Sequence, residues 1–172
     1  LRPGTEEQAV LLEAGYAVLK GDTLAGFLDG ETARGLELLV GKPSSDIIPV
    51  ELEGETVYVR ITGGDTTCRL ETEGGQVTGL TVACRVTAQL AEYRTQPNRK
   101  QLQTVEEELT RVETARLTRA LTQLRAWGAG CAGLGVRSAL SAPEAWRQIE
   151  EDWEEWFARL EPSLEVQVDI QD

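Results

Sequence analysis

A glycine-rich segment carries a spacing that is typical of a cofactor loop. Gly128, Gly130 and Gly133 spell G-x-G-x-x-G, the fingerprint with which a tight turn brings a dinucleotide pyrophosphate to the start of a helix. That fingerprint needs a strand before it and a βαβ unit around it, whereas a long helical pattern precedes it here. We therefore interpret Gly128 as the residue that ends a helix and the remaining glycines as a tight connection between helices. No cofactor is expected.

Carboxylates and thiols form no recognisable catalytic group. An acidic run, which a metal or an acid–base reaction could use, consists of Glu150, Glu151, Asp152, Glu154 and Glu155. Helical spacing places most of it opposite a set of tryptophans, so we expect a solvated helix face and no metal site. The chain has no histidine, which removes the usual Ser/His and Cys/His nucleophile pairs. The sequence therefore predicts no enzyme.

The three cysteines show no metal-binding spacing. Cys68, Cys84 and Cys131 lie far apart without a C-x-x-C pair, so a zinc site is not expected. Their redox state stays open, because an odd count leaves at least one free thiol.

Composition indicates one acidic globular domain over residues 1–172. The chain is 41% hydrophobic and 27% charged, with a formal net charge of −12. Both halves are acidic, so phosphate backbones and anionic lipid surfaces would be repelled, and no nucleic-acid partner is expected. No apolar run approaches the roughly 18 residues that cross a bilayer.

The glycine segment must be positioned by a long helix from Gln101 to Trp127. Its apolar residues recur at steps of three to five: Leu102, Val105, Leu109, Val112, Leu117, Leu121 and Leu124. The residues assigned to the solvated side are Glu106, Glu107, Arg111, Glu113 and Arg125, with Glu107 and Arg111 one turn apart. Pro97 and Asn98 open the helix, and Asn98/Gln101 or Thr104/Glu107 supplies the capping box.

The amino-terminal region predicts a hairpin and a short helix. Residues 8–28 alternate as two strands around Lys20–Asp22. The helix that follows begins after Asp29 and ends at Gly41, before Pro43. Its expected buried stripe consists of Leu36, Leu39 and Val40. Gly35, inside this helix, indicates close packing against a neighbour, with the helix lying on a sheet.

From residue 47 to residue 93 the pattern has a period of two. About four antiparallel strands are expected, separated at Gly54, Gly63–Gly64 and Gly74–Gly75. An odd-length loop with a bulge at Gly74–Gly75 would place Cys68 on the same face as Cys84. We expect both thiols to be small buried groups and not a disulfide.

The carboxyl-terminal region predicts helices and a last strand. A short helical piece covers Val136–Leu140, and Ser141 to Glu144 form a capping box with Pro143 in the first turn. One helix then buries an aromatic side that consists of Trp146, Ile149, Trp153, Trp156, Phe157 and Leu160. Most of these should cover the core, although one or two tryptophans could anchor another protein. Residues 164–170 alternate as a strand that returns to the sheet.

Strands followed by helices predict an α+β fold. We expect an antiparallel or mixed β-sheet with helices, including the long one, packed on one face.

Three motifs follow one another along the chain. The first, similar to G-x-A-x-x-K-x-D-x-L-x-G, consists of Gly15, Ala17, Lys20, Asp22, Leu24 and Gly26. An E-T-x-R-G-L helix follows with Glu31, Thr32, Arg34, Gly35 and Leu36, and Ala33 lies between Thr32 and Arg34. The last matches are Gly133 and Gly135 of a D-x-F-G-F-G turn, and Trp146, Trp153 and Phe157 of the final helix. Gly130 stands where that turn has its Asp, and Ala132 and Leu134 replace its aromatics.

Together these motifs resemble the Ger(x)C family of spore germination lipoproteins, the C subunits of spore germinant receptors. The resemblance implies the carboxyl-terminal domain of a non-enzymatic receptor subunit. Such proteins are tethered by an upstream lipidated cysteine to the outer face of the spore inner membrane, where they assemble with the A and B membrane subunits. None of Cys68, Cys84 or Cys131 is that cysteine. We expect the fragment to be a monomer whose contact surface includes Glu31, Thr32 and Arg34, with Trp153 and Trp156 second. The alternative is a domain that binds a small germinant directly.

Overall fold

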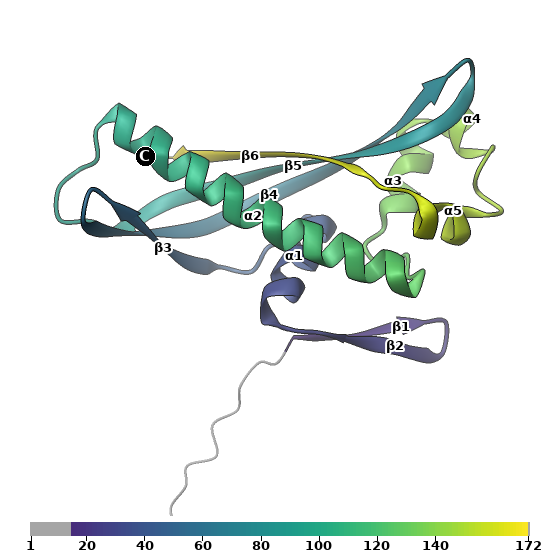
Figure 1. Cartoon of the computed structure of the whole chain (residues 1–172), viewed down its shortest axis with the longest axis horizontal. Coiled ribbons are helices and arrows are strands. Elements are labelled where there is room, and N and C mark those ends of the chain that lie inside the picture. Colours follow the sequence, from purple (N-terminus) through teal and green to yellow (C-terminus); the bar gives the residue numbers. More distant parts are fainter. Residues whose placement is uncertain (1–14, 172) are drawn as a thin grey trace, which may run out of the picture.

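The computed structural model describes residues 15–171 of the chain, and Figure 1 shows their arrangement. The strands are β1 (Tyr16–Lys20), β2 (Thr23–Leu28), β3 (Asp46–Leu52), β4 (Glu55–Glu73), β5 (Gln76–Glu92) and β6 (Ser163–Gln171). The helices are α1 (Gly30–Val40), α2 (Arg99–Trp127), α3 (Leu134–Ser141), α4 (Pro143–Trp146) and α5 (Trp153–Arg159). The part of the predicted first strand between Val10 and Ala14 lies outside the described residues.

A four-stranded mixed sheet of order β3-β4-β5-β6 carries the fold. The first three strands are antiparallel, and β6 returns parallel to β5 after the helices. Along β4 buried and exposed side chains alternate, so one face meets the core and the other meets water. In Figure 1, α2 crosses the core face diagonally over most of its length. The predicted α+β fold with a mixed sheet is confirmed.

The sheet has one strand fewer in this region than the predicted four, because one of the glycine pairs does not end a strand. Gly63 and Gly64 do not end a strand, because β4 runs through them with a register shift against β5 between Ile61 and Gly63. The 19 residues of β4 therefore join two of the expected strands into one. A bulge absorbs the local misfit without breaking the ladder.

The turn between β4 and β5 is shorter than expected, yet Cys68 and Cys84 lie on the same face of the sheet, as expected. Glu73 pairs with Gln76 around a two-residue Gly74–Gly75 loop, so the predicted odd loop is wrong. A register shift between Glu71 and Thr72 supplies the extra residue instead and sets Cys68 opposite Val82. Cys68 and Cys84 thus lie on the core face as buried free thiols, as predicted.

The cap residues of α1 are those that the sequence predicts. The Asp29 carboxylate accepts a hydrogen bond from the Thr32 amide at 2.8 Å, and Gly41 ends the helix at φ 77°. The predicted stripe is partly wrong: Leu39 is buried, but Val40 is 36% exposed and Leu38 takes its place in the core. The cause is a different neighbour, because α1 packs on α2 as well as on the sheet.

Gly35 makes the close approach of α1 to α2 possible. A Cβ at this position would lie 2.1 Å from the backbone oxygen of Arg116, far inside van der Waals contact. The close packing is as predicted, but the partner is a helix and not the sheet.

Helix α2 has the predicted ends. Asn98 and Gln101 form the capping box, and Gly128 closes the helix in the left-handed conformation at φ 58°. The core side includes Val105, Leu109, Leu117, Leu121 and Leu124, as the spacing predicted.

Two predictions about the solvated side of α2 are wrong. Glu113 is only 1% exposed, because α1 and β3 cover this part of the helix and bring charged partners to it. Arg111 pairs with Glu108 at 2.6 Å, three residues before it, and Glu107 instead accepts a hydrogen bond from Gln103.

The predicted aromatic helix is broken into two pieces. It stops at Trp146 and restarts at Trp153. Between the two pieces, backbone amides bond to the carbonyl oxygen three residues before them, as Ile149 N–H does to Trp146 O. The break lets the Gln148 side chain bind the β4–β5 turn, donating to Gly75 O at 3.0 Å and accepting from the Val77 amide at 3.3 Å. The capping box of Ser141 is also wrong, since its hydroxyl donates to the carbonyl oxygen of Cys68.

Candidate functional site

Glu31, the first candidate contact residue, is tied to the neighbouring helix. Its carboxylate accepts hydrogen bonds from Arg116 of α2 at 2.9 and 3.3 Å, while 56% of its side chain stays exposed. Arg116 also contacts Asp46 at 2.9 Å and Glu113 at 3.1 Å, so one guanidinium joins α1, α2 and the start of β3.

Burial makes this cluster electrostatically unusual. Desolvation raises the pKa of Glu113 above its ordinary value, although the guanidinium of Arg116 opposes the rise. Oxygen Oε2 of Glu113 has no hydrogen-bond partner among the described residues. The charges therefore depend on Arg116, which is itself 10% exposed. Such a cluster fixes the relative positions of three elements and offers no open site.

Arg34 and Thr32, the other candidates on α1, also have intramolecular partners. The Arg34 guanidinium lies 3.2 Å from Glu37, whose carboxylate also accepts from the Tyr16 hydroxyl at 2.8 Å and the Ser44 amide at 2.9 Å. Burial alone would raise the pKa of Glu37, but these hydrogen bonds together lower it below its ordinary value. Glu37, which follows the family-like motif, thus joins α1 to the hairpin and to the residues after the helix, and Arg34 pairs with it within α1.

Four aromatic side chains form a cluster at the other end of α2. Trp153 stacks on Phe157 with ring centroids 5.4 Å apart and lies 5.1 Å from Trp146 and 5.6 Å from Trp156. Phe157 is buried, whereas the three tryptophans are half-buried. Gly135 permits this arrangement, because a Cβ there would lie 3.0 Å from both Trp146 and Trp153.

An apolar groove of about 590 Å³ opens beside this cluster. It is bounded by the tip of the β1–β2 hairpin, the glycine-rich connection, α3 and the start of α5. Large apolar side chains stand exposed on both walls: Leu19 is 58% exposed, Val136 66% and Leu140 79%. Lys20 and Glu154 close one side with an ion pair at 2.9 Å. Trp153, a candidate anchor, lines this groove, whereas Trp156 does not.

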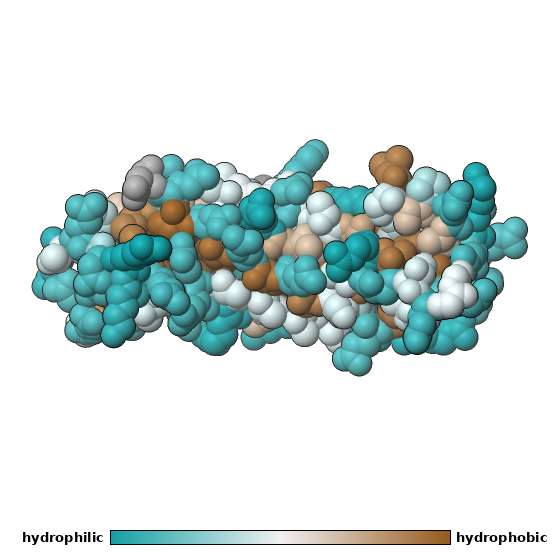
Figure 2. All heavy atoms as spheres, turned by 90° about the horizontal axis from the view of Figure 1, so that it is seen from above, coloured by the Kyte–Doolittle hydropathy of each residue, from teal (hydrophilic) through white to brown (hydrophobic). Residues whose placement is uncertain are grey.

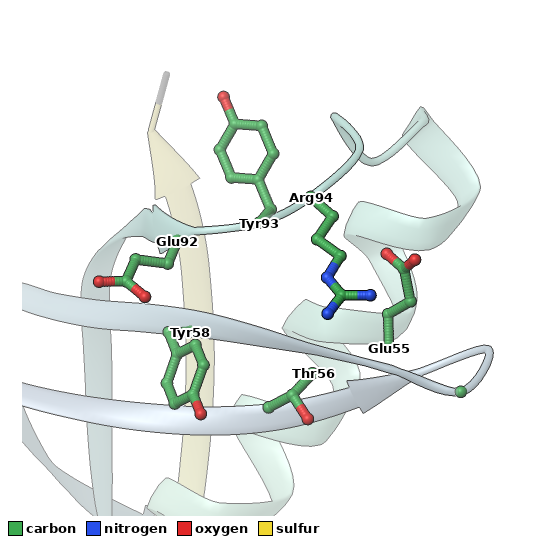
Figure 3. A pocket seen from close by; sticks show the side chains of 7 residues that line it. Glu55, Thr56, Tyr58, Glu92, Tyr93 and Arg94 are labelled. Carbon is green, nitrogen blue, oxygen red and sulfur yellow. The ribbon is translucent and has the colours of Figure 1, made fainter.

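A second groove, of about 470 Å³, lies beside the β3–β4 turn and the end of β5, and Figure 3 shows it from close by. Its lining is polar and aromatic: Gly54, Glu55, Thr56, Tyr58, Glu92, Tyr93 and Arg94. In Figure 3 the Arg94 side chain points toward the strand that carries Thr56 and Tyr58, while Tyr93 points away from it. Side chains of both charge signs and one tyrosine ring, that of Tyr58, thus lie close together at this groove.

Residues 15–171 form neither a cluster of metal ligands nor a membrane-spanning helix. Among residues 15–171, no group of three or more His, Cys, Asp or Glu side chains is placed to hold a metal ion. No helix in that part of the chain is long and apolar enough to cross a bilayer. The five carboxylates between Glu150 and Glu155 are all exposed.

The sequence pattern did not predict which apolar residues stand exposed on the walls of the apolar groove. Leu140 and Val136 belong to a short helix whose apolar side chains point both inward and outward, so periodicity could not identify the exposed ones. Leu19 sits on a hairpin strand whose buried neighbour is Val18. A signal was nevertheless present, since Leu19 and Lys20 fall inside the first family-like motif.

The chain matches one family of known proteins. A family model described as "Spore germination B3/GerAC like, C-terminal" matches residues 14–172. The crystal structure of the GerBC protein superposes with a TM-score of 0.72 at 16% sequence identity, covering 88% of this chain and 48% of that one. This likeness shows a shared fold, and the chain spans about half the length of the GerBC protein. No curated protein sequence matches the chain.

The match covers almost the whole chain, so the chain belongs to this spore germination family, as the motifs predicted.

Proposed function

We propose that this member of the spore germination B3/GerAC-like family is a non-enzymatic interaction domain of a germinant-receptor C subunit. It acts by binding the A and B membrane subunits of the receptor during nutrient-triggered germination. The whole protein is held at the outer face of the spore inner membrane by a lipid anchor upstream of this domain, and the domain itself is a monomer.

Exposed apolar side chains at one end of the molecule are the observation that carries this proposal. On a chain with a net charge of −12, large apolar groups at the surface mark a contact with another protein. Leu19, Val136 and Leu140 stand around one groove, and Phe27 on the nearby hairpin is 73% exposed. Aromatic rings at its floor are the residue type that interface hot spots favour.

The predicted contact residues remain candidates within this proposal. Glu31 and Thr32 are partly exposed on α1, Arg34 lies beside them, and Trp153 and Trp156 belong to the aromatic cluster. Reversal of charge at Arg34 would place a second carboxylate beside Glu37, so Arg34→Gln is the cleaner variant. It should weaken assembly of the receptor while the domain keeps its circular dichroism spectrum.

The test is retention of the full-length protein on its membrane subunits. Spore membranes are solubilised in mild detergent, a tagged membrane subunit is purified, and the bound C subunit is quantified. The proposal expects retention of the intact protein and loss of retention when residues 14–172 are deleted. Equal retention with and without these residues would assign the contact to another part of the protein.

A second candidate function is direct binding of a small germinant. The groove of Figure 3 favours it, because Arg94 could pair with a carboxylate and Glu92 with an ammonium group of one zwitterionic ligand. Calorimetry of the full-length protein with amino acids, sugars and nucleosides separates the two functions. Saturable binding that Arg94→Gln abolishes would establish the second function.

A further inference from the structure

The apolar groove has chemistry that selects one kind of occupant. Its floor is formed by Trp146 and Trp153, and its two walls present Leu19 on the hairpin and Leu140 on α3. The volume of about 590 Å³ accommodates several apolar side chains at once. Apolar groups that stand outward on opposite walls, with aromatic rings between them, suit the insertion of protein side chains.

The groove borders an acidic segment of the chain. Glu154 lines it directly, and residues 143–162, which carry α4 and α5, contain seven acidic residues against two arginines. On the lining of the groove, Lys20 and Glu154 neutralise each other in an ion pair, so the negative charge comes from the other carboxylates of residues 143–162. Arg137 of α3 does not offset it at the groove, because its guanidinium donates to the carbonyl oxygens of Leu39 and Val40. An occupant with basic residues beside its apolar ones would therefore be attracted.

We infer that this groove receives a protein segment of leucine-sized apolar side chains flanked by lysine or arginine, supplied by a membrane subunit of the receptor. The inference rests on the proposed function and names the site and the chemistry of its partner. A second copy of this chain fits poorly, because both surfaces would carry the same negative charge. An anionic lipid surface fits poorly for the same reason.

Cys131 makes the groove accessible to a direct test. It lines the groove and is exposed, whereas Cys68 and Cys84 are buried, so of the three cysteines in this chain Cys131 is the one that a benzophenone maleimide can reach. The labelled full-length protein is assembled with its membrane subunits in detergent, irradiated, and analysed by mass spectrometry of the cross-linked peptides. The expected product joins Cys131 to a membrane-subunit segment with apolar residues flanked by Lys or Arg.

A matched pair of variants controls for non-specific capture. Leu140→Glu places a carboxylate on the groove wall and should lower the cross-link yield at least about tenfold, as expected for loss of a hot-spot contact. Ile47→Glu makes the same change at a 49% exposed residue of β3 outside the groove and should leave the yield within about twofold. Both side chains are exposed, so both variants should fold.

The other products of the cross-linking experiment distinguish the groove assignment from the proposed function. A cross-link to a second copy, to lipid, to an acidic segment or to the protein's own preceding residues would overturn the inference, as would equal yields from the two variants. If the C subunit is retained on the membrane subunits but Cys131 yields no cross-link, the groove assignment fails and the proposed function stands. If the subunit is not retained at all, both fail.

Discussion

Arg116 is the residue on which the packing of three elements depends most. Its guanidinium contacts Glu31, Asp46 and Glu113, and the last of these is 2% exposed at its side chain. Removal of one partner from a buried ion cluster leaves uncompensated charge, which costs far more than the cluster contributes as a whole. Arg116 therefore connects the family-like helix α1 to the long helix.

Arg116→Met should lower the free energy of unfolding by about 3 kcal/mol, because Glu113 and Asp46 lose their counter-charge. Urea unfolding followed by circular dichroism measures this. Arg111→Met is the matched control on the same helix, since Arg111 pairs with Glu108 in water and should matter by less than about 1 kcal/mol. Arg116→Met combined with Glu113→Leu should recover part of the loss. Equal effects of Arg116→Met and Arg111→Met would show that the cluster is not needed.

Glu37 should stabilise the folded protein at neutral pH and lose this effect as the pH falls. Its pKa is lowered in the folded state, so its contribution is present above the unfolded-state value of about 4.3 and is lost as pH falls through the folded-state pKa. Glu37→Gln should therefore be less stable than the parent near pH 7, and the difference should shrink below about pH 4. Urea unfolding across this pH range measures it. A difference that grows on acidification would contradict this account, and exposed Glu150→Gln should stay within about 0.5 kcal/mol of the parent.

At the scale of elements, the contact between α1 and α2 depends on Gly35. Because a Cβ there would meet backbone, which cannot rotate away, Gly35→Ala should destabilise the protein by about 1–3 kcal/mol. Gly30→Ala is the control in the same helix, since a Cβ at Gly30 meets nothing within 4 Å and should leave the stability unchanged or raise it by up to about 1 kcal/mol. Thermal unfolding of the two variants gives the comparison. A stable Gly35→Ala variant would mean that the helices can separate without loss.

The ends of α1 and α2 were predictable from local rules, whereas the capping box predicted at Ser141 was wrong. Asp29, Gly41, Asn98 and Gly128 cap their helices as expected, because capping is a matter of neighbouring residues. The course of β4 through Gly63 was not predictable, since a glycine pair serves a turn and a bulge equally well.

The break in the aromatic helix has a cause that sequence spacing cannot show. Seven residues of continuous helix would separate Trp146 from Trp153 by about 10 Å along the axis. Their rings instead lie 5.1 Å apart, and the break also frees Gln148 to bind the β4–β5 turn. Similarly, the burial of Glu113 follows from the tertiary position of Arg116 and Asp46. The apolar groove was the least predictable part of the structure, because the exposure of Leu140 depends on which elements surround it.

At the scale of the whole molecule, the elements that carry the two grooves lie toward opposite ends of the long axis: the β3–β4 turn at one end, and the tip of the β1–β2 hairpin with α3 and α5 at the other (Figure 1). Figure 2 shows a mostly hydrophilic surface on which hydrophobic side chains emerge in patches along the length of the molecule. An acidic body with apolar contact points is suited to selective protein binding, since its charge repels copies of itself. The separation of the grooves allows one experiment to distinguish partner binding from germinant binding.

Hydrogen–deuterium exchange of the full-length protein, free and assembled with its membrane subunits, tests the central claim most directly. Assembly should slow amide exchange in residues 19–21 and 129–140, the two walls of the apolar groove, because a bound segment excludes water there. The groove of Figure 3 should exchange equally in both states. Unchanged exchange at residues 19–21 and 129–140, with slowing at residues 54–58 and 92–94 when a germinant is added, would contradict the account.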